Sequence, residues 1–191
     1  MSNDLKFKIS MEAIEKLDIK QRKRNLVGSA SCGLCGLESS ESLYRILPSV
    51  GKVKMKIDTA NAEKAISALH ENQLLNSKTH SVHAAAWVNS SGEIIITRED
   101  VGRHNALDKL IGNALINDQL DPKTQFITCS GRLNFELVQK VLMTDIGIMI
   151  GVGAPTSLAI DLANKFDMTL VGFVKRESFN IYTNNKKVIV S

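Results

Sequence analysis

The sequence has few cysteines, no long apolar run and little excess of charge. Its three cysteines, Cys32, Cys35 and Cys129, are too few and too odd in number for the disulfide framework of a small secreted domain. No apolar run approaches the length of a membrane span, and the opening residues MSNDLKFKIS lack the apolar stretch of a signal peptide. These absences predict a cytoplasmic protein with reduced thiols and no membrane partner.

The charge balance narrows the class of partner. Lys and Arg number 24 against 20 Asp and Glu, which gives a net charge of +4. The dense basic stripe that nucleic-acid binding usually needs is absent, so we expect no nucleic-acid partner. A mild positive charge suits an anionic small molecule or an acidic protein. With 191 residues and 43% hydrophobic content, the chain can bury one sizeable core.

The pattern of apolar residues predicts an α/β fold. Residues 52–58 alternate as a half-buried strand, and Asp58 or Thr59 is expected to cap the following helix. Residues 81–88 and 93–99 are two apolar runs joined by NSSG, which predicts a β-hairpin. Beyond Asp100, helices alternate with the short apolar strands 125–129, 146–152 and 169–174, a pattern typical of parallel strands covered by helices on both faces. We therefore expect a mixed, mostly parallel sheet.

Three strand-to-helix turns, which we call the marked turns, carry charged side chains, glycines or hydroxyl groups. Ligands bind at the carboxyl ends of parallel strands, where these turns are expected to lie. The first turn, TREDVGRHNALDK, is rich in charge. The second, CSGRLNFE, lies just before a helix, where free N–H groups favour an anion. The third, GVGAPTS, offers Pro155 as a first-turn residue and Thr156 or Ser157 as a cap. Together they predict a pocket for a phosphorylated ligand. The candidate residues are Arg103, Lys109, Ser130, Gly131, Arg132, Pro155 and Thr156. The alternative is that each cluster is an ordinary helix cap.

The stretch SASCGLCGLESS, residues 29–40, places Cys32 and Cys35 in a loop of small residues that we expect to be mobile. A zinc site with His80 and His83 is one alternative, but an i, i+3 pair on a strand points to opposite faces. A redox dithiol would be expected where a strand leads directly into a helix, whereas these cysteines are predicted to lie in a loop. Sulfur transfer fits better, because flanking glycines give a persulfide carrier the freedom to move. Two idle thiols remain a fourth possibility.

Two further residues bear on the chemistry. Cys129 ends an apolar strand and is predicted to be buried. HAAAW resembles the H-x-E signature of zinc deaminases, but His83 is followed by Ala84 and Ala85, and no P-C-x-x-C occurs downstream. An architecture of that kind would therefore have lost deamination, and we expect no structural metal.

The motifs CGLCG, HAAAW, REDVGRHNALDK, SGR before FELVQK, GAPTSLAIDLA and LVGFVKRESFNIYT resemble the FdhD family, the sulfur-transfer accessory proteins of formate dehydrogenase. The resemblance covers nearly everything from about Arg22 to about Thr183. It implies a cytidine-deaminase-like three-layer α/β/α fold and a homodimer. It also implies an enzyme, a sulfurtransferase that takes sulfur from a cysteine desulfurase. The sulfur would pass to the bis-molybdopterin guanine dinucleotide cofactor before that cofactor enters formate dehydrogenase.

Carried onto this sequence, the resemblance makes Cys32 the persulfide cysteine and Cys35 its neighbour. The segment FVKRES falls where the family contacts the cofactor, which adds Phe173, Val174, Lys175, Arg176, Glu177 and Ser178 to the cofactor-binding residues. An alternative function is a chaperone that binds the molybdenum cofactor or a guanine nucleotide without thiol chemistry.

This chain departs from the family pattern in two places. Family members usually begin with a further segment, and here the fold is expected to start partway through, so we expect a shortened member or an incomplete gene product. Thr79–Val82 reads THSV where the family commonly has T-G-G, which further weakens a zinc role for His80. We expect residues 1–50 to be a peripheral lead-in with the C-x-x-C loop, and residues 51–191 to form the deaminase-like domain.

Overall fold

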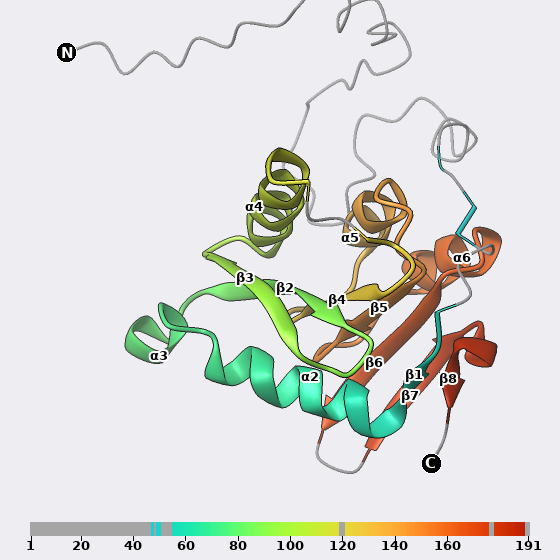
Figure 1. Ribbon diagram of the computed structural model, residues 1–191, viewed down its shortest axis with the longest axis horizontal. Coiled ribbons are helices and arrows are strands. Elements are labelled where there is room, and N and C mark those ends of the chain that lie inside the picture. Colours follow the sequence, from blue (N-terminus) through green and yellow to red (C-terminus); the bar gives the residue numbers. More distant parts are fainter. Residues whose placement is uncertain (1–46, 48, 51–54, 119–120, 176–177, 190–191) are drawn as a thin grey trace, which may run out of the picture. The chain divides into compact units, whose positions relative to one another are not determined.

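Six strands form one mixed sheet in the described part of the chain (Figure 1). The structure, a computed structural model, describes residues 47, 49–50, 55–118, 121–175 and 178–189. The strands lie in the order β3-β2-β4-β5-β6-β7. Their bounds are β2 His83–Asn89, β3 Ile94–Asp100, β4 Gln125–Cys129, β5 Ile148–Gly151, β6 Thr169–Lys175 and β7 Ser178–Thr183.

The strand directions explain how a mixed sheet arises from this sequence. β4, β5 and β6 pair in parallel, and each of these pairs is joined by a helix, as the alternating pattern predicts. β2 pairs antiparallel with both β3 and β4, and β7 pairs antiparallel with β6. β3, β4, β5 and β6 therefore run in one direction, and β2 and β7 run in the other. The predicted hairpin of β2 and β3 is confirmed.

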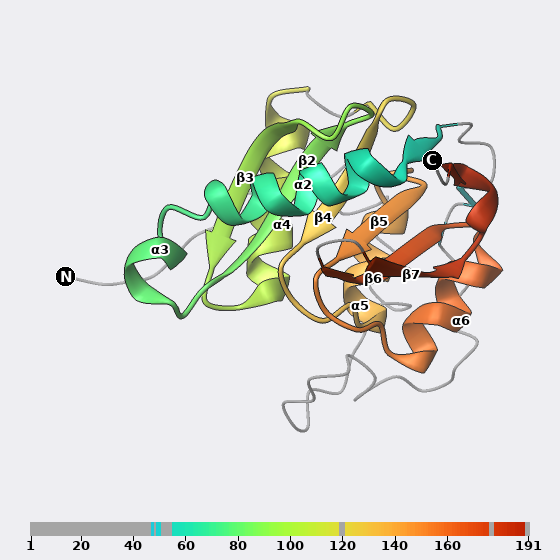
Figure 2. The same cartoon turned by 90° about the horizontal axis from the view of Figure 1, so that it is seen from below.

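Helices cover both faces of the sheet, which confirms a three-layer α/β/α fold (Figures 1 and 2). Helix α2 lies on one face, and α4, α5 and α6 lie on the other. The helices are α2 Thr59–Glu71, the short α3 Asn76–Thr79, α4 Arg103–Ile116, α5 Phe135–Leu142 and α6 Ser157–Lys165. None of the described helices is long and apolar enough to cross a membrane.

Alternate residues of β2 pack against the two layers. Ala84, Ala86 and Val88 belong to the buried cluster that also includes Ala65 and Leu69 of α2. Trp87 points to the opposite face, where its Nε1 donates to the carbonyl of Leu110 in α4 over 3.3 Å. Trp87 is 1% exposed, as expected of a core residue. Three small alanines in β2 let α2 and α4 approach the sheet closely.

The first and last described strands form a second, small parallel sheet. β1, Ile57–Asp58, pairs with β8, Val188–Ile189, which follows the 3-10 helix η2, Asn185–Lys187. Beside them, Lys187 is 7% exposed and its Nζ donates to the carbonyls of Val50 and Asp167. Burial lowers the pKa of Lys187. This lysine ties the segment before β1 to the residues that follow α6.

The start of α2 behaves as predicted, whereas the strand before it is shorter. Asp58 is the N-cap, and its carboxylate accepts from the N–H of Ala60 over 2.9 Å. Of the predicted strand 52–58, the structure shows Ile57–Asp58 as β1, and residues 51–54 lie outside the described residues. Residues 47–191 form one compact unit. The expected boundary at residue 50 stays a prediction.

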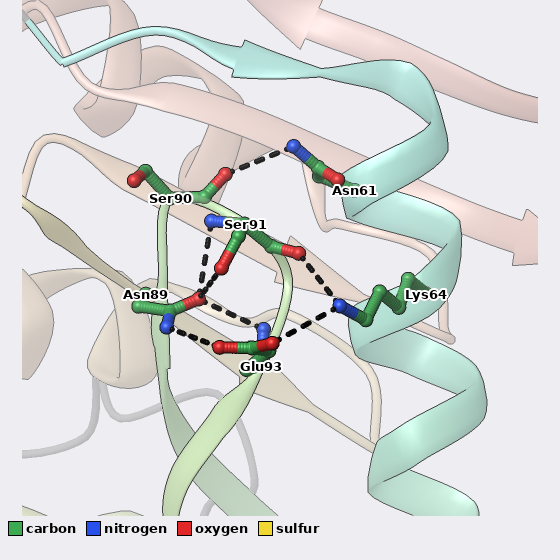
Figure 3. A network of polar contacts seen from close by, with 6 residues as sticks. All are labelled: Asn61, Lys64, Asn89, Ser90, Ser91 and Glu93. Atoms are coloured by element: carbon green, nitrogen blue, oxygen red, sulfur yellow. Dashed lines mark hydrogen bonds and ion pairs between the residues drawn. The ribbon is translucent and has the colours of Figure 1, made fainter.

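Polar side chains of α2 donate hydrogen bonds to the turn between β2 and β3 (Figure 3). Asn89 Oδ1 accepts from the N–H of Ser91 over 3.1 Å, which closes the turn on itself. From α2, Asn61 Nδ2 donates to the carbonyl of Ser90 over 3.0 Å, and Lys64 Nζ donates to the carbonyl of Ser91 over 3.2 Å. The contacts from Asn61 and Lys64 hold α2 against the end of the hairpin, because each joins a side chain of α2 to a turn carbonyl.

Replacing Gly92 by alanine is expected to destabilise the fold. Gly92 has a φ of +78°, and a Cβ there would lie 2.4 Å from the carbonyl oxygen of Asn61. A left-handed non-glycine residue costs roughly 1 to 3 kcal/mol, and the clash adds to that. We expect Gly92→Ala to lower the urea midpoint of unfolding, measured by circular dichroism.

The matched control is Gly112→Ala in the middle of α4, where a Cβ would have no neighbour within 4 Å. This change should raise stability by up to about 1 kcal/mol, because alanine favours the helix. If Gly92→Ala proves as stable as Gly112→Ala, the turn does not hold α2 as described.

Candidate functional site

The marked turns lie at one edge of the sheet because the strand register places them there. Asp100 at the end of β3 is paired with His83 at the start of β2, and Cys129 at the end of β4 is paired with Ala85. Cys129 is also level with Gly151, the last residue of β5. The β3–α4, β4–α5 and β5–α6 turns therefore leave the sheet from the same edge.

Ser130 joins the end of β4 to the start of β2. Its N–H donates to the carbonyl of Ala84 over 3.0 Å, and its Oγ accepts from the N–H of Ala84 over 2.9 Å. The same Oγ lies 3.5 Å from Nδ1 of His83. Ser130 thus fixes the turn after β4 and brings His83 to it.

Arg103 and His83 flank Gly131 from two different elements. A Cβ built on Gly131 would lie 3.3 Å from Cδ of Arg103 and 3.3 Å from Nδ1 of His83. A side chain at position 131 would have to enter between the arginine and the imidazole. Because position 131 is a glycine, the turn is buried there, with the two basic side chains close on either side of it.

The β4–α5 and β5–α6 turns are joined along their backbones. The N–H of Leu133 donates to the carbonyl of Ala154 over 3.1 Å, and the N–H of Thr156 donates to the carbonyl of Leu133 over 2.9 Å. A Cβ on Gly153 would lie 2.8 Å from Cα of Arg132. These contacts place the SGR turn directly beside the GAPT turn.

One local expectation about these turns is wrong. Pro155 is not in the first turn of α6, because it precedes the N-cap Thr156 and forms an isolated bridge with Leu133. Ser130 to Arg132 lie just before α5, as expected, with Leu133 between them and the N-cap. Asn134 is the N-cap, and its side chain accepts from the N–H of Leu137 over 3.2 Å. The anion-binding N–H groups expected of α5 are therefore partly used by its own cap.

Lys109 already has acidic and carbonyl partners. Its Nζ lies 2.5 Å from Oδ2 of Asp100 and donates to the carbonyl of Glu99 over 3.2 Å. The hydrogen bond from Lys109, followed by those from the N–H of Gly102 and from Asn105, lowers the pKa of Asp100 to about 2. Lys109 would have to leave a fully ionised carboxylate to reach a ligand.

The other predicted site residues differ in their exposure and in whether the structure describes them. Arg132 and Thr156 are exposed, Arg103 is half-buried, and Ser130 and Pro155 are partly accessible. Phe173, Val174 and Lys175 lie on the backbone of β6, and Lys175 pairs with Ser178 of β7. A Cβ on Gly172 would lie 3.0 Å from Cδ of Pro155, so this part of β6 adjoins the GAPT turn. Cys32, Cys35, Arg176 and Glu177 lie outside the described residues.

Sequence reasoning considered His83 only as a possible zinc ligand or a deaminase remnant. In the structure, His83 opens β2 at the site edge, and burial, followed by the charge of Arg103, lowers its pKa. Its signal in the sequence was its position at the start of a buried strand. His80 is exposed at the end of α3. Within the described residues, no three His, Cys, Asp or Glu side chains form a metal-binding group.

His104, in contrast, joins two helices. Its Nε2 lies 3.1 Å from Oε2 of Glu136 and 3.0 Å from Nδ2 of Asn134. Burial and Arg103 lower the pKa of His104, while Glu136 raises it. These contacts hold the first turn of α4 against the start of α5.

A groove of about 600 Å³ lies away from this edge. It is lined by residues of α4, α5 and the turns that follow them: Asp108, Ile111, Leu115, Pro122, Lys140, Met143, Thr144 and Asp145. Two of these residues, Lys140 and Asp108, form an ion pair. The marked turns do not contribute to this groove.

The chain matches a family model described as the FdhD/NarQ family over residues 2–189. It is 37% identical to a protein named sulfur carrier protein FdhD from Agrobacterium fabrum, over 90% of this chain and 63% of that protein. A protein of the same name from Xanthomonas euvesicatoria is 39% identical, over 96% of this chain and 64% of the relative. The chain therefore spans slightly less than two thirds of the length of these relatives.

The fold is similar to a crystal structure named for a formate dehydrogenase accessory protein from Desulfotalea psychrophila. The TM-score is 0.69 at 27% sequence identity, covering 79% of this chain and 63% of that chain.

Cys129 is expected to be unreactive in the folded protein. It is 4% exposed, and burial raises the pKa of its thiol to about 12. Since the thiolate is the reactive form, iodoacetamide at neutral pH should leave Cys129 unmodified in native buffer and alkylate it in concentrated urea. Peptide mass spectrometry would measure both. Rapid alkylation of Cys129 in native buffer would contradict its burial beneath the site.

Proposed function

Since this chain belongs to the FdhD/NarQ family, we propose that it is a sulfur carrier, a sulfurtransferase that moves persulfide sulfur. The sulfur donor is a cysteine desulfurase, and the acceptor is the bis-molybdopterin guanine dinucleotide cofactor. The loaded cofactor then enters formate dehydrogenase, in the cytoplasm. The protein acts as a homodimer. The names of the relatives and of the similar structure support sulfur carriage and a link to formate dehydrogenase.

One observation carries the cofactor half of this proposal: three turns from separate strands meet around Gly131. Arg103 arrives from the β3–α4 turn, Arg132 lies next to Gly131, and Pro155 lies beside them through the Leu133 bridge. Two arginines at this turn, of which Arg132 is exposed and Arg103 half-buried, suit the diphosphate of a dinucleotide. The backbone of β6 adjoins the same place, which supports the proposed contact of residues 173–178 with the cofactor.

Not every residue contributes equally in this proposal. Arg103, Arg132, Ser130 and Gly131 form the centre of the binding site, with Pro155 and Thr156 at its border. Lys109 takes part only if a ligand phosphate replaces Asp100 as its partner, because the two are paired in the structure. The segment 173–178 contributes the remaining contacts to the guanine end.

The sulfur-loading step is a thiol exchange on Cys32. The thiolate of Cys32 attacks the terminal sulfur of the donor's persulfide, so a new sulfur–sulfur bond forms. The donor's own sulfur–sulfur bond breaks, and its cysteine leaves as a thiolate that takes up a proton. The exchange involves no net oxidation. Cys35 assists as the neighbouring thiol.

Cys32 is expected to carry the sulfur. After incubation with a cysteine desulfurase and cysteine, the intact mass of the wild-type protein should rise in steps of about 32 Da, the mass of one added sulfur. Cys32→Ala should lose this gain, and Cys35→Ala should reduce it. The matched control is Cys129→Ala, which should load normally because the thiol it removes is buried.

The outcomes separate the possible roles of the two cysteines. Loading of Cys32→Ala but not of Cys35→Ala would reverse their roles. Loading of both single variants and of the double variant would rule out carriage on this loop. If the double variant also still supports formate dehydrogenase activity, the protein is a cofactor chaperone without thiol chemistry.

Arg132 is expected to bind the nucleotide end of the cofactor. Guanosine diphosphate is a convenient probe, and calorimetric titration measures its affinity. Arg132→Ala should weaken binding about ten- to a hundredfold, since a charged hydrogen-bond partner is lost, while sulfur loading of Cys32 stays normal.

The control is Lys123→Ala, which removes an equal charge from the turn before β4, at the opposite edge of the sheet. It should leave nucleotide affinity unchanged within about twofold, because the charge is distant and screened. Equal affinities for the Arg132→Ala and Lys123→Ala variants would remove Arg132 from the site.

A further inference from the structure

Large apolar side chains are exposed at two places in the described part of the chain. One group lies on and beside α3 and β3, and the other lies where α4 and α5 end. The members of the second group are Leu115, Ile116 and Met143, with 64%, 85% and 52% of their surface exposed. Exposed apolar side chains that gather on one face mark interaction surfaces. Leu115 and Met143 also line the groove of about 600 Å³ described above.

The groove is lined by α4 and α5, which lie on the same face of the sheet (Figure 1). Its α4 side is a single stripe of the helix, because Asp108, Ile111 and Leu115 are spaced by three and four positions. Pro122 and Met143 add apolar surface from the segments that follow the two helices. An apolar groove beside helices is a surface on which an amphipathic helix of another protein packs its apolar face.

Gly112 lies on the same stripe of α4, four positions after Asp108 and three before Leu115. A Cβ there would have no neighbour within 4 Å, so packing inside the described chain does not require a glycine. Glycine weakens a helix relative to alanine, but it lets another backbone approach closely. The glycine therefore fits a surface against which a second helix packs at short distance.

The groove is locally acidic, although the whole chain has a net charge of +4. Nζ of Lys140 contacts both carboxylate oxygens of Asp108, so these two charges offset each other. Asp145 is exposed in the groove, and its carboxylate has no hydrogen bond or ion pair with any described residue. The remaining charge of the groove is therefore negative. An occupant with a basic residue beside its apolar face would complement it.

We propose that this groove is the docking site of the sulfur donor, which presents an amphipathic helix with basic residues beside its apolar face. This inference rests on the proposed function, which needs two protein partners. Formate dehydrogenase receives the cofactor and has to reach the edge of the sheet where the cofactor binds. None of the described cofactor-binding candidates lines the groove. The donor delivers sulfur to a cysteine, so docking in the groove leaves the cofactor edge free.

The direct test compares two sulfur sources for the full chain. One is a cysteine desulfurase with cysteine, and the other is glutathione persulfide, a small donor that needs no docking surface. In both reactions the thiolate of Cys32 attacks the terminal sulfur of the persulfide, and the donor's own thiolate leaves. The initial rate of the mass gain of about 32 Da is measured with the desulfurase well below saturation, where the rate depends on docking.

Leu115→Lys and Met143→Lys each place a positive charge in the apolar part of the groove. Each should lower the loading rate with the desulfurase about tenfold, because apolar contact is lost and a basic helix is repelled. Loading from glutathione persulfide should be unchanged. The matched control is Leu74→Lys, which replaces a leucine that is 73% exposed before α3 and should match wild type with both sources.

Two further variants test the close approach and the charge. Gly112→Leu adds a side chain where the described chain leaves open space, so it should keep the fold and slow the desulfurase reaction as strongly as Leu115→Lys. Asp145→Asn removes the charge, and asparagine tolerates the φ of 59° at this position. It should slow the desulfurase reaction about two- to fivefold at low salt and make it less sensitive to salt.

The results separate this inference from the proposed function. If all four groove variants load from the desulfurase at the wild-type rate, the inference is wrong and sulfur carriage stands. Equal losses with both sources would show damage to the carrier itself and also overturn the inference. Dissociation of Leu115→Lys into monomers in sedimentation, with wild type a dimer, would assign the groove to a second copy and overturn it too. If wild type gains sulfur from neither source, the proposed function fails, and the inference fails with it.

Discussion

The paired hydrogen bonds between Ser130 and Ala84 are the constraint on which the site depends. They join the end of β4 to the start of β2, two strands that run in opposite directions. An antiparallel neighbour places the amino end of β2 among the carboxyl ends of β3, β4 and β5. The first side chain of β2, His83, therefore enters a site that is otherwise built from strand-to-helix turns. In an all-parallel sheet that position would face the opposite edge.

Much of the fold could be predicted because its signals are local. The alternation of apolar residues in β2, the turn NSSG and the cap at Asp58 each depend on neighbours within a few residues. The buried strand at 125–129 and the burial of Cys129 follow from one apolar run. The alternation of helices with short apolar strands also predicted helices on both faces of the sheet, and the family resemblance agreed with it.

The detail of the site depended on contacts between distant segments. Pro155 fits the first position of a helix in the sequence, yet it pairs with Leu133, which is 22 residues earlier in the chain (155 − 133). Lys109 reads as a free cation beside a helix start, but only the return of α4 over β3 brings it to Asp100. His83 has no local signal of a partner, because Ser130 and Arg103 reach it from other elements. Such pairings cannot be read from spacing alone.

The small sheet of β1 and β8 has a consequence for how the protein is made. Ile57 pairs with Val188, 131 residues later in the chain (188 − 57), and Lys187 beside it holds the carbonyl of Val50. Translation proceeds at about 5 to 20 residues per second, so β8 is synthesised roughly 7 to 26 seconds after β1. During that time the residues of the hairpin and of the parallel strands are synthesised. The segment before α2 can therefore reach its final place only after β8 has been synthesised.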